Sequence, residues 1–118
     1  MALCVLQKPW QFREVYRGGR KIDGKCAVVF YYHPGEGQSG TRFGFVASKR
    51  VGGAVSRSRA KRLLREAARQ AARRLRTEDL WIVVVARAGI FNASYQELLD
   101  ELVTQFDRAG LLRPERGT

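Results

Sequence analysis

The sequence predicts a small α/β domain, because a strand, a long helix and a second strand follow one another in its centre. Residues 41–48 (TRFGFVAS) alternate apolar side chains with small or polar ones, as a half-buried strand does. Residues 56–76 carry apolar side chains at helical spacing, and residues 80–86 (LWIVVVA) form an unbroken apolar run of strand length. This order predicts a crossover unit in which the helix covers one face of a sheet. At 118 residues the chain is expected to form one domain.

The charge predicts a polyanionic partner. The chain has 22 lysines and arginines against 11 acids, a formal net charge of +11 and a pI near 10.6. Lysine and arginine release the counterions condensed on phosphates, so nucleic acid is the expected partner and an anionic membrane is a minor alternative.

The remaining composition excludes several classes. Cys4 and Cys26 are too few for a disulfide framework and indicate free thiols in a reducing cytosol, with Cys26 as small apolar filler. With one histidine and no C-x-x-C, a zinc site is not expected. The apolar residues 1–6 are too few for a signal-peptide core or a membrane span, so we expect a soluble cytoplasmic protein.

Residues 8–17 (KPWQFREVYR) predict a short first helix. Pro9 suits the first helical position, where its missing N–H is not needed, and a glycine pair follows the helix. Phe12, Val15 and Tyr16 share one face. The spacing favours packing of Phe12 and Tyr16 in the core, and the alternative is a half-exposed aromatic platform for unpaired bases.

Two strands are predicted next. Residues 25–33 (KCAVVFYYH) are rich in β-branched and aromatic side chains, and residues 34–40 read as a loop. Residues 41–48 then form the second strand of an antiparallel hairpin, with Phe43, Phe45 and Ala47 on one face. Gly44 lies on the other face, where a missing side chain indicates either close approach of another group or a bulge.

The helix predicted over residues 56–76 is the most basic element. Eleven of the 22 basic residues lie between Lys49 and Arg76, with Glu66 as the only acid among them. Its apolar stripe consists of Ala60, Leu63, Leu64, Ala67, Ala71 and Leu75, and its opposite stripe of Arg62, Arg65, Arg69, Arg73 and Arg76. Like charges at this spacing repel by a few tenths of a kcal/mol per pair, which a polyanion would relieve. The pattern therefore favours a helix that binds a polyanion over one whose basic face is only solvated. The glycines at residues 52–53 also leave backbone N–H groups exposed at the start of the helix, and such groups favour phosphate.

The last elements are a buried strand and an amphipathic helix. After a turn at residues 77–79, the apolar run 80–86 fits a strand buried on both faces beside a parallel neighbour. Ser94 and Glu97 form a capping box for a helix that Gly110 ends near residue 109. Its inward side chains are predicted to be Leu98, Leu99, Leu102, Val103 and Phe106. Its outer face, directed to water, is predicted to carry Glu97, Asp100, Glu101 and Asp107.

No catalytic constellation is predicted. His33 alone cannot supply both an acid and a base. Glu97, Asp100 and Glu101 cluster at helical spacing, but on a different element from the basic stripe, so a solvated face is favoured over a two-metal nuclease site. The residues by themselves therefore predict an RNA- or DNA-binding domain.

Residues 43–70, above all FGFVASKRVGGAVSRSRAKRLLREAAR, resemble the signature of the bacterial ribonuclease P protein subunit. That signature is an apolar strand ending in Ser-Lys-Lys/Arg, a glycine link, Ala-Val, and a basic run R-N-R-x-K-R-x-x-R-E, which here spans residues 57–66. The first-helix aromatics, the strands and the last helix follow in the same order, so the resemblance covers essentially the whole chain. Ser58 stands where the family usually has asparagine, and Ala60 where a larger aliphatic residue is common.

The resemblance implies an α+β domain with the order α-β-β-β-α-β-α, in which helices pack on a four-stranded mixed sheet. It also implies a fourth short strand near residues 20–24 and a left-handed β-α-β crossover. We expect a single RNA-binding domain over residues 1–118, with an ordered core at 8–110 and a frayed tail at 111–118.

The resemblance also implies a function: the protein subunit of ribonuclease P, which binds the catalytic RNA and the 5′ leader of precursor tRNA and promotes endonucleolytic removal of the leader. The chemistry is expected in the RNA subunit, which uses Mg²⁺, with no catalytic residue, metal or cofactor in the protein. One protein per RNA and no DNA or membrane partner are expected. The alternative is a structural RNA-binding protein of ribosomal type.

The resemblance implies two sets of binding residues. The catalytic-RNA set consists of Ser48, Lys49, Arg50, Arg57, Ser58, Arg59, Lys61, Arg62, Arg65 and Arg69. The leader set consists of Phe12, Tyr16, Val28 and Phe30, which assigns to Phe12 and Tyr16 the role of a binding platform.

Overall fold

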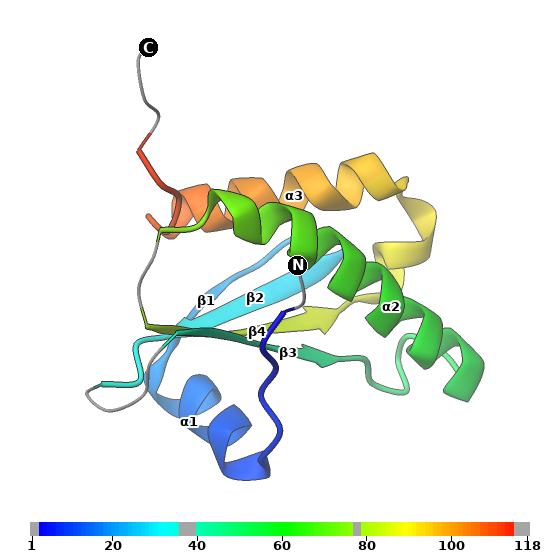
Figure 1. Ribbon diagram of the computed structural model, residues 1–118. Helices are drawn as coiled ribbons and strands as arrows, with labels where there is room; N and C mark the ends of the chain where they lie inside the picture. Colours follow the sequence, from blue (N-terminus) through cyan, green and yellow to red (C-terminus); the bar gives the residue numbers. More distant parts are fainter. Residues whose placement is uncertain (1–2, 36–39, 77–78, 115–118) are drawn as a thin grey trace.

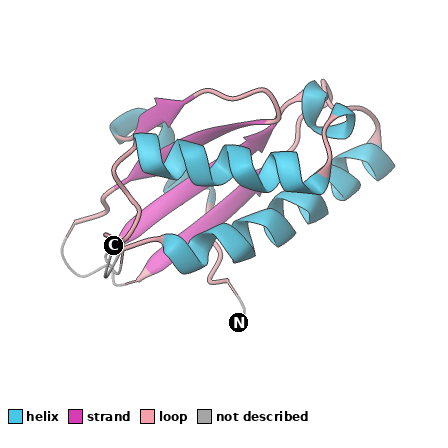
Figure 2. Cartoon of the chain, turned by 90° about the horizontal axis from the view of Figure 1, so that it is seen from above, coloured by secondary structure: helices cyan, strands magenta, loops and turns pink. Residues whose placement is uncertain are grey.

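The computed structural model describes residues 3–35, 40–76 and 79–114. The elements are α1 (Pro9–Gly18), β1 (Arg20–Ile22), β2 (Ala27–Tyr32), β3 (Thr41–Val46), α2 (Ala54–Ala71), the 3₁₀ helix η1 (Ala72–Arg74), β4 (Leu80–Ala86), the 3₁₀ helix η2 (Ala88–Asn92) and α3 (Tyr95–Arg108). The predicted loop at 34–40 and turn at 77–79 lie partly outside the described residues. Figure 1 shows α1 on one face of the sheet and both α2 and α3 on the other, and Figure 2 shows α2 and α3 side by side over the sheet.

The sheet has the order β1-β2-β4-β3. Strand β2 pairs antiparallel with β1 and β4, and β3 pairs parallel with β4. The expected fourth strand is therefore confirmed as β1, and the parallel neighbour of the apolar run is confirmed as β3. The predicted hairpin between the strands at 25–33 and 41–48 is wrong, because β4 lies between them. Strand β4 is buried along both faces except at Val85, because it lies in the centre of the sheet, where helices cover both faces.

The core between the sheet and the α2–α3 pair has the predicted composition. Ala60, Leu64, Ala67 and Ala71 are buried on α2, and Ala68 is buried with them. The small side chains let α2 lie close to β3, where Phe43 and Phe45 stack at 6.0 Å on the face predicted for them. The alternation read from residues 41–48 therefore identified the buried face correctly even though it gave the wrong partner strand.

Helix α2 is shifted from its predicted span. It begins after Gly53, whose extended backbone forms the N-cap, and it passes into η1 after Ala71. Leu75 then adopts an extended conformation and pairs with Leu112, so it remains buried outside the helix. The basic stripe predicted to run to Arg76 consequently ends with α2, because the chain must leave the helix to reach β4.

The core under α1 is smaller and is built around Val15, Trp81 and Val83. A Cβ atom on Gly44 would lie 2.5 Å from Cε2 of Phe12, so the missing side chain of β3 makes room for that ring. The N-terminal segment pairs with β3: Leu6 N donates to Phe43 O at 2.7 Å. Leu6 is buried, although the predicted core of 8–110 did not include it.

Both ends of α3 are closed by the predicted residues. Ser94 and Glu97 form a reciprocal capping box, and Gly110, at φ 75°, ends the helix with Gly110 N donating to Asp107 O and Leu111 N to Phe106 O. Of the tail expected to be frayed, Leu111 is buried and Leu112 pairs with Leu75, and residues 115–118 lie outside the described residues.

Glu101 is a correction to the predicted outer face of α3. Its Oε1 accepts hydrogen bonds from the backbone N–H groups of Lys25 (3.0 Å) and Cys26 (3.2 Å), and its Oε2 from those of Cys26 (2.9 Å) and Ala27 (3.0 Å). Glu101 therefore points at the start of β2 and not at water. Helical spacing could not predict this, because the groups that it binds are backbone atoms more than 70 positions away.

Candidate nucleic-acid interface

The outer face of α2 and the β3–α2 connector carry the catalytic-RNA set predicted from the resemblance. Its exposed members are Ser48, Lys49, Arg50, Ser58, Arg59, Lys61, Arg62 and Arg65, and its half-buried members are Arg57 and Arg69. We call this set the basic face. Val55 is 84% exposed at the start of the same helix. The helix therefore presents a cationic surface with an apolar side chain at its N-terminal end.

Several guanidinium groups of the basic face are held by the protein. Arg57 Nη1 donates to Gly52 O at 3.2 Å and ties the start of α2 to the connector. Arg59 lies over the ring of Phe91 at 5.5 Å, and Arg65 over the ring of Phe45 at 5.7 Å. The Phe91 and Phe45 rings belong to η2 and β3, so they support arginines on two flanks of the helix. This support reduces the side-chain entropy that binding would otherwise remove.

Arg69 differs from the rest of the basic face. Its Nη1 lies 2.9 Å from Glu66 Oε1, one turn earlier on the same helix. The pair neutralises charge near the C-terminal end of α2. Within the basic face, the cations without an ion pair to a described residue therefore lie at residues 49–65, nearer the start of the helix, where the helix dipole also favours an anion.

The connector forms a turn that only glycine completes without strain. Gly52 adopts φ 142°, and its N–H donates to Lys49 O at 3.1 Å, while Val51 N donates to Ser48 O at 3.0 Å. A side chain at Gly52 would also meet Ser56 Cβ at 2.8 Å. The glycine link recognised in the sequence thus positions Ser48 and Lys49 beside the start of α2.

A pocket of about 620 Å³ joins the two predicted binding sets. It is lined by Ser48 and Arg50 from the connector and by Val28 and Val85 from the sheet. Lys25 and Arg87 add two cations that the sequence analysis did not assign. Arg87 directly follows β4 beside the end of the parallel strand β3, which is a signal that could have identified it. Lys25 could not have been identified in this way, because the turn before β2, and not the end of a predicted strand, brings it to the pocket.

The leader set lies on α1 and β2, and we use the name aromatic cleft for its four residues, Phe12, Tyr16, Val28 and Phe30. The rings of Tyr16 and Phe30 meet edge to face at 4.9 Å, and Tyr16 is 43% exposed. Val28 and Phe30 are half-buried on β2. Burial raises the pKa of the Tyr16 hydroxyl, so it stays protonated near neutral pH and can donate a hydrogen bond. Phe12 is half-buried against Gly44, so its ring both packs in the core and borders the cleft.

Glu97 and Glu101 of α3 accept hydrogen bonds from the protein itself. Among the described residues there is no group of three or more histidine, cysteine, aspartate or glutamate side chains that could hold a metal ion. Glu97 is bound to Ser94, whose backbone and side-chain hydrogen bonds lower the pKa of this carboxyl. Glu101 is bound to the start of β2. Over the described chain, there is also no helix long and apolar enough to cross a membrane.

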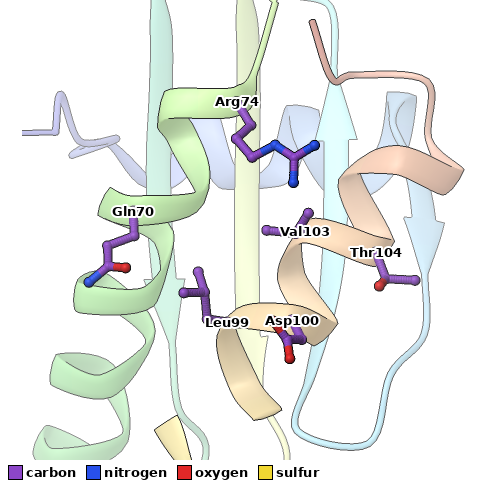
Figure 3. A pocket seen from close by; sticks show the side chains of 6 residues that line it. All are labelled: Gln70, Arg74, Leu99, Asp100, Val103 and Thr104. Carbon is purple, nitrogen blue, oxygen red and sulfur yellow. The ribbon is translucent and has the colours of Figure 1, made fainter. Parts of the chain in front are cut away.

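A second pocket, of about 430 Å³, lies between α2 and α3. Figure 3 shows Gln70 and Arg74 on one wall and Asp100 and Thr104 on the other, with Leu99 and Val103 between the helices. Asp100 accepts a hydrogen bond from Gln96 Nε2 at 2.8 Å. Because one wall is basic and the other acidic, this pocket does not continue the basic face.

Comparisons with known proteins show which family this chain resembles. The Ribonuclease P family model matches residues 2–110. The ribonuclease P protein component of Symbiobacterium thermophilum is 42% identical over 106 residues, covering 88% of this chain and 89% of the relative, and that of Shouchella clausii is 36% identical over 112 residues, covering 95% and 90%.

Solved structures show the same fold. The Staphylococcus aureus RNase P protein superposes with a TM-score of 0.75 at 23% identity, covering 92% of this chain and 96% of that one. The Thermotoga maritima RNase P protein gives 0.74 at 21% identity, covering 88% and 96%. The basic run after a glycine link, the α+β fold with its four-stranded mixed sheet and the match over residues 2–110 together show that this chain belongs to the ribonuclease P protein family.

Proposed function

We propose that this protein serves ribonuclease P by holding two RNAs on two adjacent surfaces. The basic face binds the catalytic RNA, and the aromatic cleft beside α1 binds the single-stranded 5′ leader of precursor tRNA. The RNA subunit, with Mg²⁺, performs the hydrolysis that removes the leader. The observation that carries this proposal is the pocket in which Ser48 and Arg50 of the basic face meet Val28 of the cleft.

The chemistry of each surface suits a different RNA. Arginine and lysine on α2 are matched to the phosphates of a folded RNA, whose backbone presents dense negative charge. Exposed aromatic rings such as Tyr16 suit unpaired bases, which offer flat faces for stacking. Lys25 and Arg87 lie between these surfaces, where they neutralise the phosphates of a leader that passes from the cleft toward the catalytic RNA.

A structural RNA-binding protein of ribosomal type is the competing function, and reconstitution distinguishes the two. The protein is added to a bacterial ribonuclease P RNA at low Mg²⁺, and cleavage of precursor tRNA is followed. Faster cleavage is expected because the protein adds affinity for the substrate. If the protein binds the RNA but cleavage stays at the rate of the RNA alone, the proposed function is wrong. A titration in the same assay should saturate at one protein per RNA.

Substitution of Tyr16 tests the cleft. Tyr16→Ala should weaken the holoenzyme's binding of precursor tRNA by about 1–2 kcal/mol, the contribution of a stacked base, and leave mature tRNA unaffected. Tyr16→Phe, which keeps the ring, is the matched control and should retain most of the affinity. Equal losses for precursor and mature tRNA would show that the ring does not contact the leader.

A further inference from the structure

A second exposed aromatic group lies on the α1 face of the sheet. Trp10 is 45% exposed, and its ring meets that of Trp81 edge to face, with 5.7 Å between centroids and an interplanar angle of 61°. Trp81 is buried and lies 6.0 Å from the ring of Tyr32. We call Trp10, Trp81 and Tyr32 the tryptophan cluster. None of its members belongs to either predicted binding set.

The strand register places the tryptophan cluster on the opposite side of α1 from the leader cleft. Tyr32, Trp81 and Arg42 are aligned across β2, β4 and β3. The next row on this face contains Phe30, Val83 and Gly44, and α1 crosses it, since Tyr16 contacts Phe30 and Phe12 lies over Gly44. The third row consists of Val28, Val85 and Val46 and belongs to the cleft and its pocket. Helix α1 therefore lies between the tryptophan cluster and the third row, to which Val28 of the cleft belongs.

The surroundings of the tryptophan cluster are basic. Arg13 and Arg17 follow Trp10 at i+3 and i+7, so they share its face of α1, and both are exposed. Arg42, also exposed, stands beside Trp81 in the first row. An acid of α1, Glu14, lies in the same surroundings and accepts a hydrogen bond from the Tyr32 hydroxyl at 3.3 Å. Exposed rings bordered by guanidinium groups are the arrangement by which proteins bind single-stranded nucleic acid.

The cluster also contains an unsatisfied donor. The indole Nε1 of Trp81 is buried, and within the described chain it has no hydrogen-bond partner. A buried donor without an acceptor is unfavourable, and such groups are rare in folded proteins.

We propose that Trp10 stacks on an unpaired base of the precursor-tRNA leader beyond the segment that the cleft holds. Phe12 at the cleft and Trp10 at the cluster are two residues apart, on opposite sides of a helix about 10–12 Å across. A strand that leaves the cleft past Phe12 therefore reaches Trp10 at the N-terminal end of α1, where Arg42 and Arg13 face its phosphates. This inference rests on the proposed function and extends it to long leaders.

Leader length tests the proposal. Holoenzyme affinity is measured for precursor tRNAs with leaders of about 4 and about 16 nucleotides, the range that single-strand-binding folds cover. Trp10→Ala should weaken the long-leader substrate about tenfold and leave the short-leader substrate unchanged, while Trp10→Phe restores most of the loss. Tyr16→Ala, in contrast, should weaken both substrates, because the cleft lies nearer the cleavage site. If Tyr16→Ala alone has an effect, the cleft is supported and the Trp10 site is wrong.

Intrinsic fluorescence gives a second readout, because the chain has only two tryptophans. In Trp81→Phe the exposed Trp10 is the sole indole, and its emission should be quenched by the long-leader substrate and not by the short-leader one. Equal quenching by both, or quenching by the catalytic RNA alone, would overturn the proposal, since Trp10 would then contact another part of the complex. A loss in Trp10→Ala that is the same for both leader lengths would overturn it as well.

Discussion

Helices α2 and α3 lie side by side on the same face of the sheet, yet their polar groups are used in opposite ways. On α3, Ser94 and Glu97 cap one end, Gly110 closes the other, and Glu101 and Gln105 bind the backbone around β2. On α2, the N-cap Gly53 offers no side-chain hydrogen bond, and most of the basic face is exposed. Ser94, Glu97 and Glu101 of α3 are bound within the protein, whereas most side chains of the basic face on α2 are exposed and available to a partner.

Acidic and basic helices therefore have different roles despite similar amphipathic patterns. Gln105 Nε2 donates to Ile22 O at 3.1 Å and to Ala27 O at 3.0 Å, so α3 fixes the β1–β2 turn. Apart from Arg69, which is paired with Glu66, the basic side chains of α2 repel one another in the free protein, and a bound anion would relieve this repulsion. A substitution on α3 should consequently affect folding first, and one on α2 should affect RNA binding first.

The largest expected effect is on α3. Glu101→Ala leaves the backbone N–H groups of Lys25, Cys26 and Ala27 without their acceptor and should lower the free energy of unfolding by about 3 kcal/mol. Chemical denaturation measures this change. Asp100→Ala, an exposed neighbour on the same helix, is the control and should change stability by no more than about 0.5 kcal/mol. Similar values for the two variants would contradict the structural role of Glu101.

The next effect is on α2. Lys61 and Arg62 make no ion pair, hydrogen bond or ring contact with the described residues, so their substitution removes charge without removing packing. The double variant Lys61→Gln/Arg62→Gln should weaken binding of the catalytic RNA by about 2 kcal/mol near 0.1 M salt and reduce the log–log salt slope by about 1.5 to 2. Its stability should be unchanged or slightly higher.

The matched control for that experiment removes two acids from α3. Asp100→Asn/Asp107→Asn changes the net charge by the same amount in the opposite sense, and its salt slope should equal that of the wild-type protein. If the two double variants change the salt slope by equal amounts in opposite directions, the overall charge and not the position of the basic face governs RNA binding.

A smaller effect is expected at the start of α3. Ser94→Ala removes the hydroxyl that accepts from Glu97 N and should cost about 1 kcal/mol of stability at pH 7. Because the pKa of Glu97 is lowered in the folded protein, its contribution is present above the unfolded carboxyl pKa of about 4.3 and is lost as the pH falls through the lower folded pKa. The difference in free energy of unfolding between the wild-type protein and Ser94→Ala should therefore become smaller in acid. Chemical denaturation at a series of pH values measures this difference. A difference that widens in acid would exclude this cap.

The smallest effect is expected at the start of α2. Gly53 has φ −73°, and a Cβ atom there would have no neighbour within 4 Å, so a side chain fits. Gly53→Ser should stabilise the free protein by a few tenths of a kcal/mol by capping the helix. Gly53→Asp should cap it similarly but weaken RNA binding, because the carboxylate would occupy the position favoured by phosphate. Equal RNA affinity for both variants would show that this helix end does not contact RNA.

Much of the fold could be predicted locally. The apolar stripe around Leu64, the two-sided burial of β4, the capping box at Ser94 and the glycine end at Gly110 each depend on residues within a few positions of one another. Their physical causes, helical periodicity, unbroken apolar runs and hydrogen bonds between near neighbours, can be read from the chain directly. The basic run and its glycine link likewise identified the family from a contiguous segment.

Three features could be decided only by the tertiary structure. Strand β4 enters between β2 and β3, because strand pairing is made by backbone groups that are alike in every residue and carry no partner code. Glu101 turns inward because the start of β2 approaches it from the far end of the sequence. Lys25 and Arg87 join Ser48 in one pocket because the start of β2 and the ends of β3 and β4 lie at the same end of the sheet. The sequence by itself determined which helix is basic and which faces are apolar, and the long-range packing of the sheet determined which surfaces lie side by side.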